Sequence, residues 1–439
     1  MSCIPYLIFG IVIITIEYRR LKKNKKIDLF SAVSLVFLVY YIFTPIVLNL
    51  NKENLLYSEQ YKPTYVLSFL EGNNNYILSF LVITTAYTLL YIAFSSKKYP
   101  MSIKKMNQCL NMELWNKKRL YYIAIIFLGI SVICMLYYCI RLGGIQNSIA
   151  ETENYRTVYS NESWLIIRFF FPLVIISSMI TMILKKQDEK LIGLNIITII
   201  SLIFTVYYLL ITGSRGKIVL FILGILFVFV RKIKPIHFII GGVFIAFMFV
   251  FGDALLSLDF SDVFDDFNNV IIKLAVQTSY PFINSLKIDS IIDYTGGYRY
   301  FSDLIYVWFV NIMPSSVTIF DNIPNTTALW HTLVAFYQYG AGGIPVDFIT
   351  FSYFQLGFIG IILLSFGFGK IITFINYLLK NSKGYMFKYL FFRSFMALID
   401  IFLNAEIEVF IRANIDIILF IMLYITFDIF NKRRNKNEY

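Results

Sequence analysis

A short polar turn between two long apolar runs carries the residues best suited to binding an anion. It reads Thr212-Gly213-Ser214-Arg215-Gly216-Lys217. Glycines let backbone amides approach an anion closely, and the start of the following helix adds positive potential. The planar guanidinium of Arg215 matches phosphate and carboxylate oxygens, and Lys217 adds a second positive charge. The turn therefore predicts an anion-binding site, with a plain helix connection carrying basic residues as the alternative.

A second group consists of residues that could act as a general base. Glu406 and Glu408 lie in a tight turn between the last two apolar runs. A carboxylate there could take a proton from a sugar hydroxyl. His331, in Leu329-Trp330-His331, could do the same near neutral pH, although a single loop histidine is more often packed or solvated. The sequence leaves the choice among these bases open.

Four more charged residues lie inside the last two apolar runs, where a charge is costly and therefore marks a functional candidate. They are Arg393, Asp400, Arg412 and Asp416. Arg412 and Asp416 are four residues apart on one expected helix, so they could pair directly. Arg393 and Asp400 share a face about two turns apart. Two interpretations stay open, namely internal ion pairs that fix helix packing and contacts to a substrate.

The elements that must hold these residues are transmembrane helices. Of the 439 residues, 58% are hydrophobic and only 15% are charged, and the charges cluster between apolar runs. Runs of about 20 residues match the hydrocarbon thickness of a bilayer, where a helix satisfies its own backbone hydrogen bonds. We expect an all-α polytopic membrane helix bundle that forms a single integral membrane domain over 1–439. The eleven or so spans are expected at about 3–17, 28–50, 76–95, 120–140, 164–184, 191–212, 217–230, 236–256, 347–369, 385–404 and 409–428.

Basic residues assign the two sides of this bundle. They cluster after the first span, from Arg19 to Lys26, and again after every second span up to the last. Because basic loops stay in the cytoplasm, we predict the amino terminus outside and the carboxyl terminus in the cytoplasm. The largest outer loop is then 257–345. It contains two short apolar pieces, 270–275 and 304–313, which we expect to be helices on the membrane surface or dipping into it.

On this topology Arg156, Arg215 and Arg299 all lie on the outer side. Arginine on the outer side runs against the orientation rule, so we expect a favourable interaction with a bound group to offset its energetic cost. The fixed fork of guanidinium donors suits phosphate and carboxylate groups. Together with Lys217 these arginines form the predicted anion-binding set, and Glu406, Glu408 and His331 lie on the same side.

Composition argues against several other classes of protein. The net charge of +12 comes from basic residues beside helix ends, so no nucleic-acid partner is expected. The four cysteines include no CxxC pair and the two histidines are far apart, so we predict neither a disulfide framework nor a metal site. The glycine-rich piece 340–343 lacks a Walker lysine and a preceding strand, which argues against a nucleotide loop. No cofactor is predicted.

The same motifs carry a resemblance to a known family. The turn 212–216 resembles the outer turn of oligosaccharide repeat-unit polymerases, the Wzy-type O-antigen polymerases. The glycine-rich piece 340–343, followed by Tyr-Phe-Gln-Leu-Gly-Phe-Ile-Gly at 353–360, is similar to the stretch that follows their long periplasmic loop. Asn154-Tyr155-Arg156 resembles their arginine-bearing outer loop. The family often has a glutamate where this chain has Phe351 and an arginine where it has Ser315, so neither role can be carried over to these positions.

The resemblance implies a polysaccharide polymerase. Such a glycosyltransferase joins undecaprenyl-diphosphate-linked oligosaccharide repeat units at the outer face of the bacterial cytoplasmic (inner) membrane, in O-antigen or capsule biosynthesis. A flippase and a chain-length regulator would be its partners, and the lipid bilayer its surroundings. The diphosphate-binding residues would be Arg156, Arg215, Lys217 and Arg299. The catalytic residues would be Arg215, which stabilises the departing charge, and one or more of His331, Glu406 and Glu408.

Three alternatives remain beside the polymerase, and the third of them is a non-enzymatic transporter or receptor. An O-antigen ligase would share this topology and differ only in its acceptor. A lipid-linked oligosaccharide flippase or transporter should have an even number of spans and charges that line a central cavity. The odd number of expected spans and the long outer loop favour the enzyme.

Overall fold

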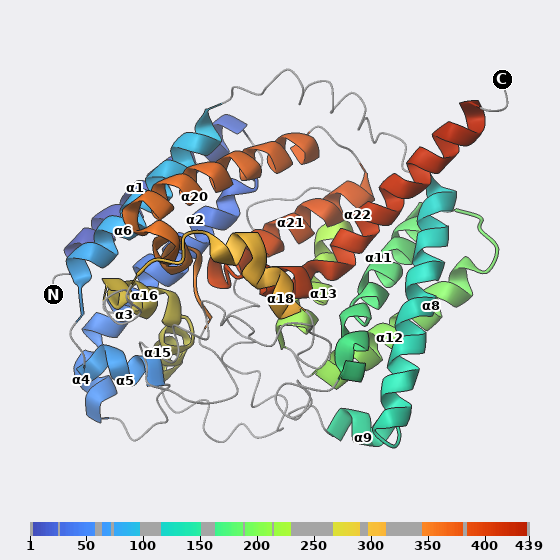
Figure 1. Ribbon diagram of the computed structural model, residues 1–439, viewed down its shortest axis with the longest axis horizontal. Helices are drawn as coiled ribbons and strands as arrows, with labels where there is room; N and C mark the ends of the chain where they lie inside the picture. Colours follow the sequence, from blue (N-terminus) through green and yellow to red (C-terminus); the bar gives the residue numbers. More distant parts are fainter. Residues whose placement is uncertain are drawn as a thin grey trace.

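The computed structural model of the protein describes residues 3–24, 27–57, 64–71, 74–96, 116–150, 163–187, 189–212, 215–229, 267–289, 297–312, 345–380 and 384–436. Within these ranges all regular structure is helical and no strand occurs (Figure 1), which confirms the predicted all-α class. Two short elements, η1 and η4, are π-helices, and η3 is a 3₁₀-helix. The elements are α1 (Ile4–Asn24), α2 (Phe30–Leu38), η1 (Val39–Phe43), α3 (Thr44–Leu50), α4 (Lys52–Tyr57), α5 (Thr64–Glu71), α6 (Tyr76–Ser95), α8 (Lys117–Arg141), α9 (Ile145–Ala150), η3 (Ser163–Phe170), α11 (Leu173–Lys186), α12 (Leu194–Thr212), α13 (Arg215–Phe229), α15 (Phe267–Gln277), α16 (Tyr280–Leu286), η4 (Asp303–Val307), α18 (Trp308–Ile312), α20 (Phe348–Lys380), α21 (Tyr385–Leu403) and α22 (Ile407–Lys436).

Seven helical stretches in the described part of the chain are long and apolar enough to cross a membrane. Each coincides with one of the predicted spans, so the chain is a multi-pass membrane protein. The first stretch is built from α2, η1 and α3 in succession. The seven are Phe30–Leu50, Tyr76–Ser95, Lys117–Arg141, Trp164–Lys186, Leu194–Thr212, Phe348–Leu379 and Ile407–Phe427.

Four predicted spans do not belong to this set. Helices α1 and α21 lie where spans were predicted. The apolar part of α1 is short, because charged residues begin at Glu17, and α21 carries Lys388, Arg393 and Asp400 along its length. Helix α13 is short, and its apolar part is Leu220–Phe229. The predicted span 236–256 lies outside the described residues. The described helices account for seven spans, and the count of about eleven stays a prediction.

The two largest hydrophobic cores divide the helices into two groups, with α21 between them (Figure 1). The first core is formed by α1 to α6 with α15, α16 and α20, and it contains Tyr41 and Phe282. The second is formed by α8, α11, α12, α13 and α22, and it contains Phe171. Helix α21 contributes Phe402 to the first core and Tyr389 to the second. The two groups are thus joined through one shared helix.

Helices α6 and α20 approach each other closely at Gly369. A Cβ atom at this glycine would lie 2.7 Å from the Ala93 Cβ and 2.8 Å from the Leu90 carbonyl oxygen. Within a membrane, helices associate through such small-residue contacts because lipid supplies little hydrophobic driving force between them. The contact holds α20 against the first group of helices.

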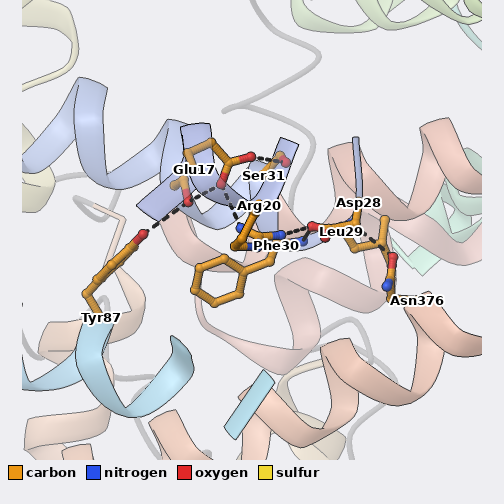
Figure 2. A network of polar contacts seen from close by, with 9 residues as sticks. Glu17, Arg20, Asp28, Leu29, Phe30, Ser31, Tyr87 and Asn376 are labelled. Atoms are coloured by element: carbon orange, nitrogen blue, oxygen red, sulfur yellow. Dashed lines mark hydrogen bonds and ion pairs between the residues drawn. The ribbon is translucent and has the colours of Figure 1, made fainter. Parts of the chain in front are cut away.

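A buried polar network joins α1, α2, α6 and α20 (Figure 2). Arg20 donates to the Glu17 carboxylate at 2.6 Å and also pairs with Asp28. Its guanidinium lies 4.7 Å from the centroid of the Phe30 ring, a cation–π contact. The network extends through Ser31, Ser34 and Tyr87, and Asn376 accepts from the Leu29 amide at 3.1 Å. Arg20 was predicted only as one of the basic residues that set orientation, yet it also fixes helix packing.

The first apolar piece of the long loop lies in the short helix α15. Helix α16 follows it and is buried against α5, α6, η1 and α20. Ser285 and Ser79 share a hydrogen bond of 2.6 Å. Asn75 donates to the Asp289 carboxylate at 2.7 Å. Burial lowers the pKa of the Lys287 ammonium, and the charge of Asp289 partly offsets this effect. The helix predicted over 270–275 is confirmed, and the segment that follows it packs inside the bundle.

Candidate functional site

Two of the long helices near the carboxyl terminus are broken. Helix α20 departs from helical geometry at Leu356 and Gly357, and α22 does so at Asn414. Gly357 has φ 62° and ψ −141°, a conformation open to glycine and costly for other residues. A Cβ atom there would also lie 2.7 Å from the Tyr298 hydroxyl oxygen. The backbone angle favours glycine at this position, and the Tyr298 ring would have to shift to make room for a larger residue.

A segment of the long loop docks onto the break in α20. The backbone amide of Arg299 donates to the Phe354 carbonyl at 2.9 Å, and that of Tyr300 donates to the Gln355 carbonyl at 2.9 Å. A helix break leaves carbonyls without their usual partners four residues on, and here the loop supplies the missing donors. Segments about 55 residues apart in the chain are thereby joined.

The side chains that follow this backbone contact form an ionic group. Arg299 binds Asp303 in a bidentate pair, with Nε to Oδ2 and Nη2 to Oδ1 both 2.7 Å. Gln355 donates to the same Oδ2 from Nε2 at 2.9 Å. Asp303 and Gln355 are buried, and the Arg299 side chain is 18% exposed. A bidentate pair supported by a third residue fixes the orientation of the guanidinium.

Glutamates from the start of α22 complete the group. Glu408 lies close enough to Arg299, Asp303 and Arg412 to interact with their charges, and Arg412 interacts in turn with Glu406. Both glutamates are buried. The turn between α21 and α22 is tied to the segment before α20, because the Ala405 amide donates to the Val346 carbonyl at 2.9 Å. We call Arg299, Asp303, Gln355, Glu406, Glu408 and Arg412 the Arg299–Glu408 cluster.

A second buried carboxylate, Asp347, lies at the start of α20. It accepts hydrogen bonds from the Tyr41 hydroxyl at 2.6 Å and from the backbone amides of Ile349 and Thr350 at 3.1 and 3.2 Å. Asn284 of α16 donates to it at 3.4 Å. Asp347 thus caps α20 and joins it to η1 and to the long-loop helix. Asp347 is not among the predicted site residues, although an aspartate directly before an apolar run is a helix-start signal.

The charges within the last two helices pair differently from the prediction. Asp416 accepts from Arg393 Nη2 at 2.8 and 3.0 Å, so the pair joins α22 to α21. The expected pairing of Arg412 with Asp416 on one helix is wrong. The break at Asn414 lies between these two residues, and it removes the regular spacing on which the expectation rested. Arg412 instead lies toward Glu408.

The structure brings together three of the predicted site residues and separates or omits the others. Arg299, Glu406 and Glu408 belong to the Arg299–Glu408 cluster. Lys217 lies over the Tyr208 ring of α12, with Nζ 5.0 Å from the ring centroid. The backbone of Arg215 begins α13, as the predicted turn required, and its side chain is not among those described. Two predicted site residues lie outside the described residues, Arg156 and His331.

Comparison with known proteins adds no assignment, because no family model, no curated protein and no solved structure matches the chain. Among the described residues, no group of three or more histidine, cysteine, aspartate or glutamate side chains could hold a metal ion. The function must therefore be inferred from this chain's own residues.

Proposed function

We propose that this protein is a polysaccharide polymerase. It would join undecaprenyl-diphosphate-linked oligosaccharide repeat units on the outer face of the bacterial cytoplasmic membrane, in O-antigen or capsule biosynthesis. The supporting observation is the Arg299–Glu408 cluster, where a buried carboxylate lies beside an oriented arginine at a break in a long apolar helix. Ionisable groups gathered at such a place in a membrane protein are costly and mark functional sites.

The cluster supplies two elements that glycosyl transfer needs. The acceptor hydroxyl oxygen attacks the anomeric carbon of the donor sugar, and the bond from that carbon to the lipid diphosphate breaks. The electron pair leaves with the undecaprenyl diphosphate, and the hydroxyl proton passes to a carboxylate, for which Glu408 is our leading assignment. Positive charge near the diphosphate stabilises the transition state. Glu406 and His331 are the alternative bases.

Diphosphate recognition is assigned to cationic residues on the same side of the membrane. Asp303 holds the guanidinium of Arg299 in one orientation, which reduces the cost of ordering it when a substrate binds. The turn around Arg215 and Lys217 offers amides and charge at the start of α13. Arg156 completes the proposed set by resemblance to the polymerase family. No cofactor enters this mechanism.

The proposal includes a topology of about eleven spans with the amino terminus outside. Support comes from α1, α13 and α21, which are helical where spans were predicted. Basic residues after alternate spans favour this orientation. The Arg299–Glu408 cluster would then face the outer side, where lipid-linked repeat units are presented by a flippase and where a chain-length regulator would act.

One observation favours transport of a lipid-linked oligosaccharide as a second candidate. Both α20 and α22 are discontinuous near the charged cluster. Secondary transporters commonly form their substrate sites from such broken helices. A transporter would move the lipid-linked unit across the bilayer unchanged, whereas the polymerase would lengthen it.

Purified protein in proteoliposomes with undecaprenyl-diphosphate-linked repeat units tests both candidates. We expect ladders of lengthened lipid-linked chains on gels. Glu408→Gln should lower the rate by roughly a hundredfold or more, the usual contribution of a general base. Glu189→Gln is the matched control, because Glu189 pairs with Lys117 outside the cluster.

Three outcomes would reassign the protein. Movement of the lipid-linked unit between leaflets without lengthening would favour the transporter. Transfer of sugar only when lipid A core is supplied would favour the ligase. Equal polymerisation by wild type and Glu408→Gln would remove Glu408 as the base, and His331→Ala and Glu406→Gln would then be compared.

A further inference from the structure

Two exposed tyrosines flank Arg299 in the segment that docks onto the α20 break. Tyr300 is 66% exposed and Tyr298 is 37% exposed. Their rings are nearly perpendicular, at 88°, with centroids 6.4 Å apart. Tyr298 packs edge-on against Tyr353, whose ring centroid is 6.4 Å away, and its hydroxyl lies beside Gly357. Tyr298 and Tyr300 therefore form an exposed pair of perpendicular rings, which we call the aromatic corner, and packing holds Tyr298 in place.

The backbone is strained at this corner. Tyr300 has φ 51° and Phe301 has φ 61°, so two consecutive non-glycine residues adopt the left-handed region. Each such residue costs of order 1 kcal/mol or more, and such strain clusters at ligand clamps and active sites. Burial of the Tyr300 ring cannot be the reason, because the ring is largely exposed. The amide bonds of Arg299 and Tyr300 to the α20 carbonyls hold the strained conformation.

Polar groups suited to sugar hydroxyls lie beside the aromatic corner. Arg299 stands between the two tyrosines in the chain, and Asp303 binds its guanidinium. Glu408 lies within electrostatic reach of both charges. Ligand sites typically combine aromatic faces, which take up apolar surface, with a few fixed polar groups that set orientation. A pyranose ring matches this combination, since its C–H face is apolar and its rim carries hydroxyls.

We infer that Tyr298 and Tyr300 form a stacking platform for one pyranose ring of an oligosaccharide chain, beside the Arg299–Glu408 cluster. Because the two rings are nearly perpendicular, the sugar face would stack on the more exposed Tyr300 ring and its edge would meet Tyr298. The inference rests on the proposed function for its choice of carbohydrate over other amphipathic ligands. An aromatic pair of this kind could instead sit in the belt of tyrosines at a membrane surface. Tyrosines of a sugar platform contribute to sugar binding, whereas tyrosines of the membrane belt do not. Measuring the binding of free sugars therefore distinguishes the two roles.

The test uses the full-length protein in nanodiscs and saturation-transfer NMR with maltotriose, lactose and chitotriose as probes. We expect at least one trisaccharide or disaccharide to bind. Tyr300→Ala should weaken that binding about tenfold, which corresponds to about 1.4 kcal/mol. Tyr300→Phe should retain most of it, because the aromatic face remains. Tyr122→Ala is the control, since Tyr122 of α8 is 58% exposed and distant in the chain from the cluster.

Two results would overturn the platform. One is that none of the three sugars binds. The other is that Tyr300→Ala binds sugar as well as wild type, whether or not the variant is less stable in the membrane, which would assign the tyrosines to the interfacial belt.

The outcome is separable from that of the proposed function. Sugar binding that depends on Tyr300, without chain lengthening in proteoliposomes, would retain the platform and reject the polymerase. Chain lengthening by Tyr300→Ala with an unchanged KM for the acceptor would reject the platform and retain the polymerase.

Discussion

The pair between Arg393 and Asp416 offers the sharpest test of how the last two helices are joined. Its two side chains are 5% and 2% exposed, and both Asp416 oxygens accept from one guanidinium nitrogen. Removing one member leaves the other as an uncompensated buried charge. We expect Arg393→Ala to lower the free energy of unfolding by about 3–5 kcal/mol. Replacing both members, by Arg393→Met with Asp416→Leu, should cost less than either single change, because no buried charge remains.

The exposed pair of Lys117 and Glu189 provides the comparison, since the Lys117 side chain is 50% exposed. Screening by solvent limits such a pair to about 0–1 kcal/mol. Lys117→Ala should therefore lower the free energy of unfolding by at most about a third as much as Arg393→Ala does. Both can be measured by reversible unfolding in mixed micelles of mild detergent and sodium dodecyl sulfate.

Double-mutant cycles then decide the partner of Asp416. Asp416→Asn combined with Arg393→Met should show a large coupling free energy. Combined with Arg412→Met, it should be additive to within about 0.5 kcal/mol. A strong coupling to Arg412, or an Arg393→Ala cost no larger than that of Lys117→Ala, would refute the interhelical pair and restore the pairing expected within one helix.

Three further substitutions test the packing that holds the site. Gly357→Ala should lower the free energy of unfolding by about 1–3 kcal/mol, because alanine must adopt a glycine conformation there and its Cβ would press on Tyr298. Gly367→Ala is the control. No atom lies within 4 Å of its added Cβ, so it should leave that free energy unchanged or raise it slightly in the same assay. Arg20→Ala should lower the free energy of unfolding by about 3–5 kcal/mol, because it leaves the buried Asp28 carboxylate and the half-buried Glu17 carboxylate without their cation; a loss below 1 kcal/mol would contradict the network in Figure 2. Tyr41→Phe should cost about 1–3 kcal/mol, since the buried Asp347 carboxylate loses a donor, and faster hydrogen exchange at the start of α20 should accompany it.

Local sequence was sufficient to predict most of the described helices. All seven helical stretches that can span a membrane were predicted, because spanning depends on length and local composition. Part of the Arg299–Glu408 cluster was also predictable, since Arg299 and Glu408 are charges in unexpected surroundings. Asp303 follows Arg299 by four residues, but the helical spacing rule does not explain this pair, because Tyr300 and Phe301 between them have positive φ.

Other members of the site could not be found in this way. Gln355 lies within an apolar run and resembles any polar residue tolerated there; its role follows from the loop that docks onto the α20 break. The aromatic corner could not be predicted either. The chain has 32 tyrosines and 44 phenylalanines, and composition does not indicate which two of them form a site. Exposure and the strained backbone of Tyr300 distinguish them.

The amino-acid sequence by itself determined that this chain folds as apolar helices, and which charged residues must be accommodated among them. The tertiary structure decided which charges meet. Arg393 pairs with Asp416, and Glu408 lies within electrostatic range of Arg299, although neither set of residues is local in the chain. Arg299 lies on the segment that docks at the break in α20, and Glu408 and Asp416 both lie on α22, which is broken at Asn414. Hydrophobic periodicity does not set the backbone angles at these breaks. At Gly357 the break is completed by a segment more than 50 residues earlier, so only the assembled fold supplies its partners.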